Sequence, residues 1–179
     1  MRQSEESFRA FARTHATQLR RSAYLLCGDW HLAEDLVQNT FIKLYRRWRR
    51  VGSDTAVRYA RKTLLRVWLD ERRRPWRRAE HRFGAVPERA HSESDPALLG
   101  QRGFTRNMLL DALSDLPPRQ RAVLVLRYWE DLPIAEVATV MRCSEGTVKS
   151  QAARGLRSLR TEIVDRDPER FGIAVEGTV

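Results

Sequence analysis

The residues with the clearest chemical potential form one face of a predicted helix that starts after Ser144. Small and cationic side chains recur on this face, namely Gly146, Lys149, Ser150, Ala153, Arg154 and Arg157. Small residues let a helix approach another surface closely, while cations bind phosphates and the edges of guanine bases. The chemistry that suits this face is therefore recognition of duplex DNA in the major groove.

Two predicted helices and a tight turn must position this face. Pro133 suits the first position of the first helix, which ends near Arg142 and Cys143. The hydroxyl of Ser144 can cap the second helix by accepting an orphan backbone N–H. Apolar residues at helical spacing predict the buried sides of the two helices, with Ile134, Val137, Ala138 and Met141 on the first, and Val148, Ala152, Leu156, Leu159 and Ile163 on the second. The pattern is that of a helix-turn-helix.

The helix-turn-helix pattern alone leaves DNA binding open. Two short amphipathic helices at this spacing also occur in all-α proteins that bind no DNA. In addition, Arg142 occupies the turn position that glycine often holds. A left-handed backbone at a residue other than glycine costs about 1 kcal/mol.

Composition and charge narrow the class of protein. The 179 residues carry a net charge of +10 and a pI of about 10.7, a balance common in proteins that meet nucleic acid or a membrane surface. No apolar run is long enough to span a membrane, and the first residues lack the apolar core of a signal peptide, so we expect a cytoplasmic protein without membrane insertion.

The residue types give no indication of a catalytic or metal centre. Cys27 and Cys143 lie far apart without partner motifs, and Cys27 with His31 supplies only half of an ordinary zinc site. There is also no nucleophile–base pair or carboxylate cluster arranged for catalysis. We therefore expect a protein that is not an enzyme and needs no metal or other cofactor.

Three helices are predicted in the N-terminal part, over residues 8–27, 31–50 and 56–74. Gly28 ends the first helix and Asp29 can cap the second. The second helix has a polar side around Asp35 and Gln38, and its end is basic, with Lys43, Arg46, Arg47, Arg49 and Arg50. The basic end is either a solvated face that suits a helix C-terminus or, after a protein-docking face, an end that meets DNA.

The third predicted helix is basic with interleaved aromatic residues. Its outer side carries Arg58, Lys62, Leu65, Arg66 and Arg73, with Arg61 at the border. Cations beside Tyr59, Trp68 and Trp76 would suit single-stranded nucleic acid, because bases stack on rings while cations follow the backbone. Trp68 lies on the apolar side, however, and a place in the core is the favoured interpretation.

The predicted fold is all-α, with two small helical domains joined by a flexible linker. We place the first domain at residues 1–76, the linker at 77–105, the second domain at 106–164 and a frayed tail at 165–179. In the second domain, Pro118 restarts a helix that is apolar on most sides to about Trp129. Such a helix is either buried or offers a docking face.

Two segments resemble a known family, the bacterial RNA polymerase sigma factors of the extracytoplasmic-function (ECF) group. GDWHLAEDLVQNTFIKLYRRW is similar to the core of the family's region 2. ALSDLPPRQRAVLVLRYWEDLPIAEVATVMRCSEGTVKSQAARGLRSLR is similar to region 4. The two motifs stand in the family's order with a linker between them, and together they are highly specific.

The resemblance implies binding to core polymerase and to the −10 promoter element through region 2. The clamp helices of the β′ subunit would bind the surface around Asp35, Leu36 and Gln38. The −10 element, held open as single strand, would face Arg58, Arg61, Lys62, Leu65 and Arg66. A flipped base would lie near the predicted loop residues Gly52, Ser53, Asp54 and Thr55. The pair Lys62-Thr63 departs from the family's small polar pair with asparagine, so the −10 bases stay open.

The resemblance also implies that region 4 reads the −35 element as duplex. This role falls on Gly146, Thr147, Lys149, Ser150, Ala153 and Arg154, with Arg157 on the backbone. The apolar segment from Leu124 to Tyr128 would help to grip the β flap, although a core role for each residue remains an alternative. An anti-sigma factor is a further candidate partner, because many relatives have one.

The implied function is that of a sigma factor, which recruits core polymerase, recognises two promoter elements and starts DNA melting. One alternative is a stand-alone helix-turn-helix regulator that binds a palindromic duplex as a dimer. Another is a basic adaptor that docks on polymerase and reads no DNA. The N-terminal domain argues against both, because neither needs a basic helix joined to a docking face.

Overall fold

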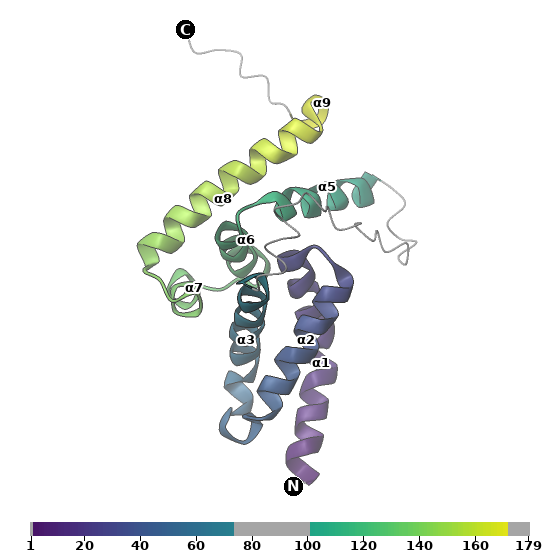
Figure 1. Ribbon diagram of the computed structural model, residues 1–179, viewed down its shortest axis with the longest axis vertical. Helices are drawn as coiled ribbons and strands as arrows, with labels where there is room; N and C mark the ends of the chain where they lie inside the picture. Colours follow the sequence, from purple (N-terminus) through teal and green to yellow (C-terminus); the bar gives the residue numbers. More distant parts are fainter. Residues whose placement is uncertain (1, 74–100, 172–179) are drawn as a thin grey trace. The chain divides into compact units, whose positions relative to one another are not determined.

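The computed structural model describes residues 2–73 and 101–171 (Figure 1). Helices joined by short turns make up these two stretches, and neither contains a strand. The chain divides into two compact units, Met1–Ser92 and Glu93–Val179. The prediction of an all-α fold with two helical domains is confirmed. Most of the predicted linker and the last eight residues of the predicted tail lie outside the described residues.

Unit 1 is a three-helix bundle. It consists of α1 (Arg2–Cys27), α2 (Trp30–Tyr45), the 3-10 turn η1 (Trp48–Arg50) and α3 (Ser53–Arg73). Each of the three long helices packs against the other two. Their apolar stripes meet in a core that includes Leu19, Ala23, Leu26, Ala33, Leu36, Leu44, Ala60, Leu64 and Trp68. Trp68 is only 1% exposed, so the prediction that it belongs to the core is confirmed.

The turn between α1 and α2 follows the sequence expectation. Gly28 has a φ of 75°, a conformation that glycine adopts without steric cost, and it ends α1. The carboxylate of Asp29 accepts a hydrogen bond of 2.7 Å from the backbone N–H of Leu32 and so caps α2.

Three boundaries in unit 1 differ from the prediction. Helix α1 begins at Arg2, whereas the sequence predicted a start at residue 8. The second helix ends at Tyr45, and only a short 3-10 turn follows where a continuous helix to Arg50 was predicted. The predicted loop is mostly helical, because α3 begins at Ser53 and the N–H of Thr55 already bonds to the carbonyl of Gly52 at 3.0 Å. Small polar residues such as serine, aspartate and threonine suit both loops and helix starts, so composition alone could not separate the two.

Unit 2 is built around one long helix. Its elements are α5 (Gln101–Asp115), α6 (Pro118–Leu124), the π-helical turn η3 (Val125–Trp129), α7 (Ile134–Met141), α8 (Glu145–Arg166) and α9 (Pro168–Phe171). Helix α8 packs against α5, α6 and α7. Pro118 is in the first turn of α6, as predicted. Helix α5 starts inside the span predicted as linker.

A glycine sets how closely α8 approaches α6. Gly155 is buried, and a Cβ added there would lie 3.2 Å from Cγ of Leu124 and 3.3 Å from Cβ of Gln120. Leu156, predicted on the buried side, is instead 44% exposed. The correction has a simple cause: the packed stripe runs through Val148, Ala152 and Gly155, which turns the next residue outward.

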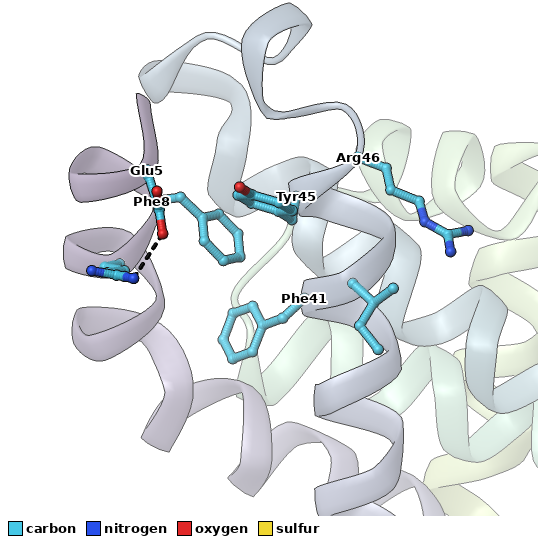
Figure 2. A pocket seen from close by; sticks show the side chains of 7 residues that line it. Glu5, Phe8, Phe41, Tyr45 and Arg46 are labelled. Atoms are coloured by element: carbon cyan, nitrogen blue, oxygen red, sulfur yellow. Dashed lines mark hydrogen bonds and ion pairs between the residues drawn. The ribbon is translucent and has the colours of Figure 1, made fainter. Parts of the chain in front are cut away.

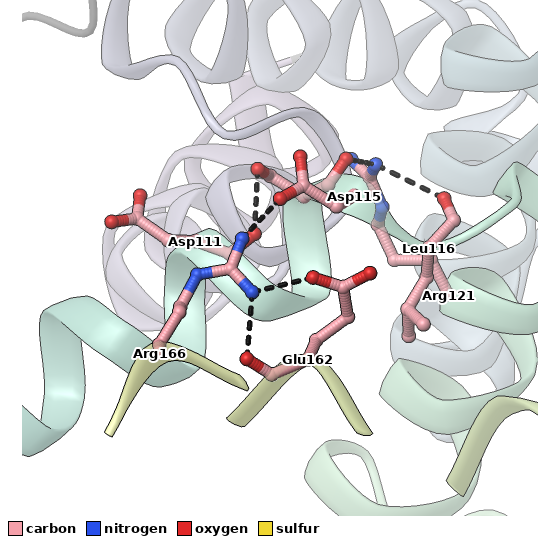
Figure 3. Close-up of polar contacts among 7 residues, drawn as sticks. Asp111, Asp115, Leu116, Arg121, Glu162 and Arg166 are labelled. Atoms are coloured by element: carbon pink, nitrogen blue, oxygen red, sulfur yellow. Dashed lines mark hydrogen bonds and ion pairs between the residues drawn. The ribbon is translucent and has the colours of Figure 1, made fainter. Parts of the chain in front are cut away.

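Arginine side chains hold the ends of the helices in unit 2 (Figure 3). Arg121, only 3% exposed, donates hydrogen bonds from α6 to the carbonyls of Ser114 and Leu116 at the end of α5. Arg166, at the end of α8, donates to the carboxylates of Asp115 and Glu162. Burial lowers the pKa of Arg166, but hydrogen bonds and charge attraction from Glu162 and Asp115 outweigh it and raise that pKa above its ordinary value.

The start of the predicted frayed tail is therefore ordered helix. Helix α8 continues to Arg166, and α9 follows it to Phe171. The sequence expectation rested on weak apolar periodicity after residue 165. The contacts of Arg166 that extend the order are polar, and a search for apolar spacing does not detect them.

Candidate nucleic-acid interface

The turn of the helix-turn-helix has the left-handed residue that the sequence pattern requires. Arg142 follows α7 with φ 53° and ψ 54°. The N–H of the next residue, Cys143, returns to the carbonyl of Ala138 at 3.0 Å. Ser144 Oγ accepts a hydrogen bond of 3.1 Å from the N–H of Thr147, so the predicted cap of α8 is confirmed. Pro133 immediately precedes α7 as its N-cap, one position before the predicted site.

One side of α8 leaves its small and cationic residues accessible. The exposed residues are Gly146, Lys149, Ser150, Ala153, Arg154 and Arg157, while Thr147 is half-buried beside Ser144. Within the described residues, the side chains of Lys149, Arg154 and Arg157 make no hydrogen bond or ion pair. The first three turns of α8 therefore present small residues and unneutralised cations together, which is the arrangement that a helix in a major groove needs.

The basic side of α3 is less uniform. Thr55 and Arg58 are exposed, and so is Gly52 just before the helix. Three more cations, Arg61, Lys62 and Arg66, are half-buried. Ser53 and Asp54 belong to the first turn of α3.

Leu65 departs from its predicted place on the outer side of α3. It is 1% exposed and therefore part of the packed interior. It stands three residues before Trp68, on a neighbouring position of the same helix, so the buried stripe of α3 is wider than the sequence analysis allowed. A side chain this buried cannot contribute to an accessible nucleic-acid face.

The residues predicted to bind polymerase divide into two groups. Asp35 and Gln38 are exposed on α2. Leu36 is 1% exposed and packs in the core of unit 1, so its assignment to a docking surface is corrected. Its neighbours at helical spacing, Ala33 and Thr40, are equally buried, and this explains the side that it occupies.

Comparison with known proteins identifies the family. Residues 5–78 match the family model described as Sigma-70 region 2, and residues 106–159 match Sigma-70, region 4. Over 160 residues the chain is 36% identical to the RNA polymerase sigma-E factor of Streptomyces coelicolor, a match that covers 89% of this chain and 88% of that protein. This chain belongs to the sigma-70 family, in its ECF group.

Further relatives agree with this assignment. The sigma factor is 34% identical over 156 residues to the ECF RNA polymerase sigma factor SigL of Mycobacterium tuberculosis, covering 85% of this chain and 86% of that protein. Among solved structures, its fold is similar to the sigma factor RpoE from Bartonella quintana, which was solved in complex with the anti-sigma factor NepR. The TM-score is 0.67 at 22% identity, with 90% of this chain and 99% of the other covered.

An apolar groove on unit 1 of the sigma factor was missed from sequence (Figure 2). It lies between α1 and α2 with a volume of about 360 Å³, and its lining residues are Glu5, Phe8, Arg9, Phe41, Ile42, Tyr45 and Arg46. The ring centroid of Phe8 is 6.2 Å from that of Phe41 and 4.9 Å from that of Tyr45. An ion pair of 2.7 Å between Glu5 and Arg9 stands at its edge.

The groove continues the polar side of α2. Ile42 and Tyr45 are 52% and 51% exposed, and with Asp35 and Gln38 they follow a spacing of three, four and three residues. Such a spacing places all four on one side of a helix. This spacing is the sequence signal from which Ile42 and Tyr45 could have been predicted as exposed. It places two large apolar residues on the same side of the helix as Asp35 and Gln38.

The segment predicted to grip the β flap is mostly core. Leu124, Val125 and Leu126 are at most 4% exposed. Tyr128, at the end of the segment, is 60% exposed, and Trp129, the residue after it, is 47% exposed. In the π-helical turn, the N–H of Glu130 reaches back five residues to the carbonyl of Val125 at 3.0 Å.

Of the helices described in either unit, none combines the length and apolar character that crossing a bilayer demands.

Proposed function

We propose that this sigma factor binds core RNA polymerase, recognises the −10 element with unit 1 and the −35 element with unit 2, and promotes the DNA melting that starts transcription. The observation that supports the proposal is that the chain has two different cationic faces, on α8 and α3, and also an exposed side of α2 suited to docking. Helix α8 offers a helix-turn-helix face suited to duplex, and α3 offers a basic face beside the exposed Gly52.

The proposed −35 contact is made by the start of α8. Lys149 and Arg154 are exposed and can reach phosphates or guanine edges, while Gly146 and Ala153 permit close approach of the backbone. Arg157 lies one turn further along α8 and suits a phosphate outside the recognised bases. Each good bidentate contact to a base contributes about 1–3 kcal/mol of discrimination.

The proposed −10 contact is made by α3 and the turn before it. Arg58, Lys62 and Arg66 supply cations for the backbone of a single strand, and the burial of Leu65 removes it from this set. Flipping a base out of the stack costs a few kcal/mol, which phosphate contacts and a pocket must offset. Gly52 and Thr55 are exposed at the expected position of the flipped base, and the absence of a side chain at Gly52 leaves room for the approach of DNA.

The proposed polymerase contact uses the side of α2 that carries Asp35, Gln38, Ile42 and Tyr45. Two polar groups and two exposed apolar side chains on one side match an amphipathic partner helix, such as the β′ clamp helices that the family binds. The groove beside Phe8 then receives an apolar side chain from that helix. On unit 2, the exposed Tyr128 at the end of the apolar segment, together with the next residue, Trp129, is able to contact the β flap.

A second class of partner is an anti-sigma factor. The similar RpoE structure contains NepR, and we extend a partner of that kind to this sigma factor. The proposed activity of the sigma factor takes place on RNA polymerase, so we assign the protein to the cytoplasm. No bond chemistry is assigned to the chain.

The proposal is tested by transcription with purified components. Core polymerase that is free of other sigma factors should start transcripts at defined positions when this chain is added, and should not do so without it. If the chain does not bind core polymerase but binds a palindromic duplex alone as a dimer, it is a stand-alone regulator and the proposal is wrong.

A further inference from the structure

A polar bridge joins the last residue of α5, Asp115, to the last residue of α8, Arg166 (Figure 3). We call this ion pair the α5–α8 bridge. The same guanidinium also contacts the carboxylate of Glu162 at 2.6 Å. The contact with Glu162 lies within α8, whereas the contact with Asp115 connects two helices that are far apart in the sequence. One arginine thus has two carboxylate partners, one inside its helix and one outside it.

The end of α5 is itself fixed to α6. Arg121 of α6 donates hydrogen bonds to the carbonyls of Ser114 and Leu116, the residues on either side of Asp115. Because Arg121 is buried, these hydrogen bonds are shielded from water. The α5–α8 bridge therefore ties the end of α8 to a firmly held point of unit 2.

Helix α8 has a second fixed point near its middle. At Gly155 it approaches Leu124 and Gln120 of α6 so closely that even one added carbon atom would be crowded. Helix α7 also packs on α8, but its eight residues form one helix-turn-helix motif with the start of α8. The direction of α8 on the rest of unit 2 is therefore set chiefly by the contact at Gly155 and by the bridge.

Two fixed points make α8 a lever. With a rise of about 1.5 Å per residue, Arg166 lies about 16 Å beyond Gly155, and Gly146 lies about 13 Å before it. If the helix pivots at Gly155, a shift of about 1 Å at Arg166 moves Gly146 by about 0.8 Å in the opposite direction. Hydrogen bonds tolerate only about 0.5 Å of variation in length. A loose end of α8 is thus enough to disturb contacts with bases at its other end.

We propose that Asp115 and Arg166 are positioning residues for recognition of the −35 element, because their bridge sets the angle at which α8 enters the major groove. The inference deepens the proposed function and rests on it, since it needs α8 to read duplex DNA. Arg166 lies more than two helical turns beyond Arg157, the last residue of the proposed DNA face, so it acts through the helix and not by contact. A purely stabilising role predicts instead that the contacts of Arg166 with Asp115 and with Glu162 are equivalent.

The experiment compares two variants that each remove one carboxylate charge beside Arg166. Asp115→Asn removes the charge that attracts Arg166 across the two helices, and Glu162→Gln, the matched control, removes the charge within α8. Each holoenzyme binds a duplex that carries the −35 element of a mapped promoter, and the same duplex with that element scrambled. Asp115→Asn should reduce the preference for the −35 duplex by about 5-fold or more, the lower end of what one bidentate base contact contributes. Glu162→Gln should keep the preference.

Both variants change the charge of the chain equally, so a general change in attraction to DNA is common to them. Both should also keep the helix content of the unchanged protein by circular dichroism and its affinity for a single-stranded −10 fragment. The proposal is overturned if Asp115→Asn keeps the preference, or if Glu162→Gln loses it equally. A loss of helix content or of −10 binding in Asp115→Asn also overturns it, because the bridge would then hold the fold and not the angle of α8. If the holoenzyme of the unchanged protein does not prefer the −35 duplex, the proposed function itself fails.

Discussion

The packing of α8 on α6 predicts that the same substitution, glycine to alanine, has different effects on stability at two positions of α8. Gly155→Ala places a methyl group 3.2 Å from Cγ of Leu124, a residue only 4% exposed and thus unable to move into solvent. Gly146→Ala places the same group at an exposed position, where the nearest atom is Ser144 Oγ at 3.8 Å.

The magnitude follows from two terms. Replacing glycine by alanine in a helix interior stabilises it by about 1 kcal/mol, a gain that applies in full at Gly155 and in smaller measure at Gly146, the second residue of α8. Overpacking a filled core costs about 1–3 kcal/mol, and this cost applies only at Gly155. We therefore expect Gly146→Ala to raise the stability of unit 2 and Gly155→Ala to leave it unchanged or lower it by up to about 2 kcal/mol. The difference between the two variants, up to about 3 kcal/mol, is the steric cost at Gly155 less the shortfall in helix gain at Gly146.

Native-state hydrogen exchange of the amides in α6 and α8 is the suitable assay, because it reports the opening free energy of unit 2 separately from unit 1. Gly155→Ala should accelerate exchange of these amides relative to Gly146→Ala. Equal exchange in the two variants would refute the close α6–α8 contact. If Gly155→Ala stabilises unit 2 as much as Gly146→Ala does, the close α6–α8 contact is also refuted.

Three further substitutions test other parts of the structure. Arg142→Gly should stabilise unit 2 by about 1 kcal/mol in urea unfolding, because glycine adopts φ 53° without strain; destabilisation would contradict a left-handed turn residue. Ser144→Ala should cost about 1 kcal/mol in the same assay by removing the α8 cap, and an unchanged midpoint would show that the cap contributes nothing. Tyr45→Ala should weaken binding to core polymerase while circular dichroism stays unchanged, and full affinity would exclude the groove from the docking surface.

Local backbone signals in the sequence predicted the structure well. Asp29 and Ser144 cap their helices as expected, because the side-chain oxygen of each accepts a hydrogen bond from an otherwise unpaired backbone N–H in the first turn. Arg142 occupies the turn position that glycine often holds, and its backbone is left-handed there, with φ 53°. These features depend on residues that are close together in the sequence, so they can be predicted from the sequence alone.

The side that each residue faces was harder to predict. Leu65 and Leu156 were each placed on the wrong side of a helix, because the width of a buried stripe depends on how many other helices pack against it. Leu36 was assigned to the docking surface through the family resemblance, although it is buried. Gly155 was not recognised as a packing residue, since its importance comes from Leu124 on another helix. The groove beside Phe8 was likewise missed, because its lining residues come from two helices, α1 and α2. Features of this kind arise from tertiary contacts that local periodicity does not contain.

The most direct test of the account separates the two DNA-binding units on one holoenzyme. Its affinity is measured for a duplex −35 fragment and for a single-stranded −10 fragment. Lys149→Ala with Arg154→Ala should weaken only duplex binding, and Arg58→Ala with Arg66→Ala should weaken only single-strand binding. If both pairs weaken both fragments equally, or if neither pair affects its own fragment, the division of promoter recognition between the two units is contradicted.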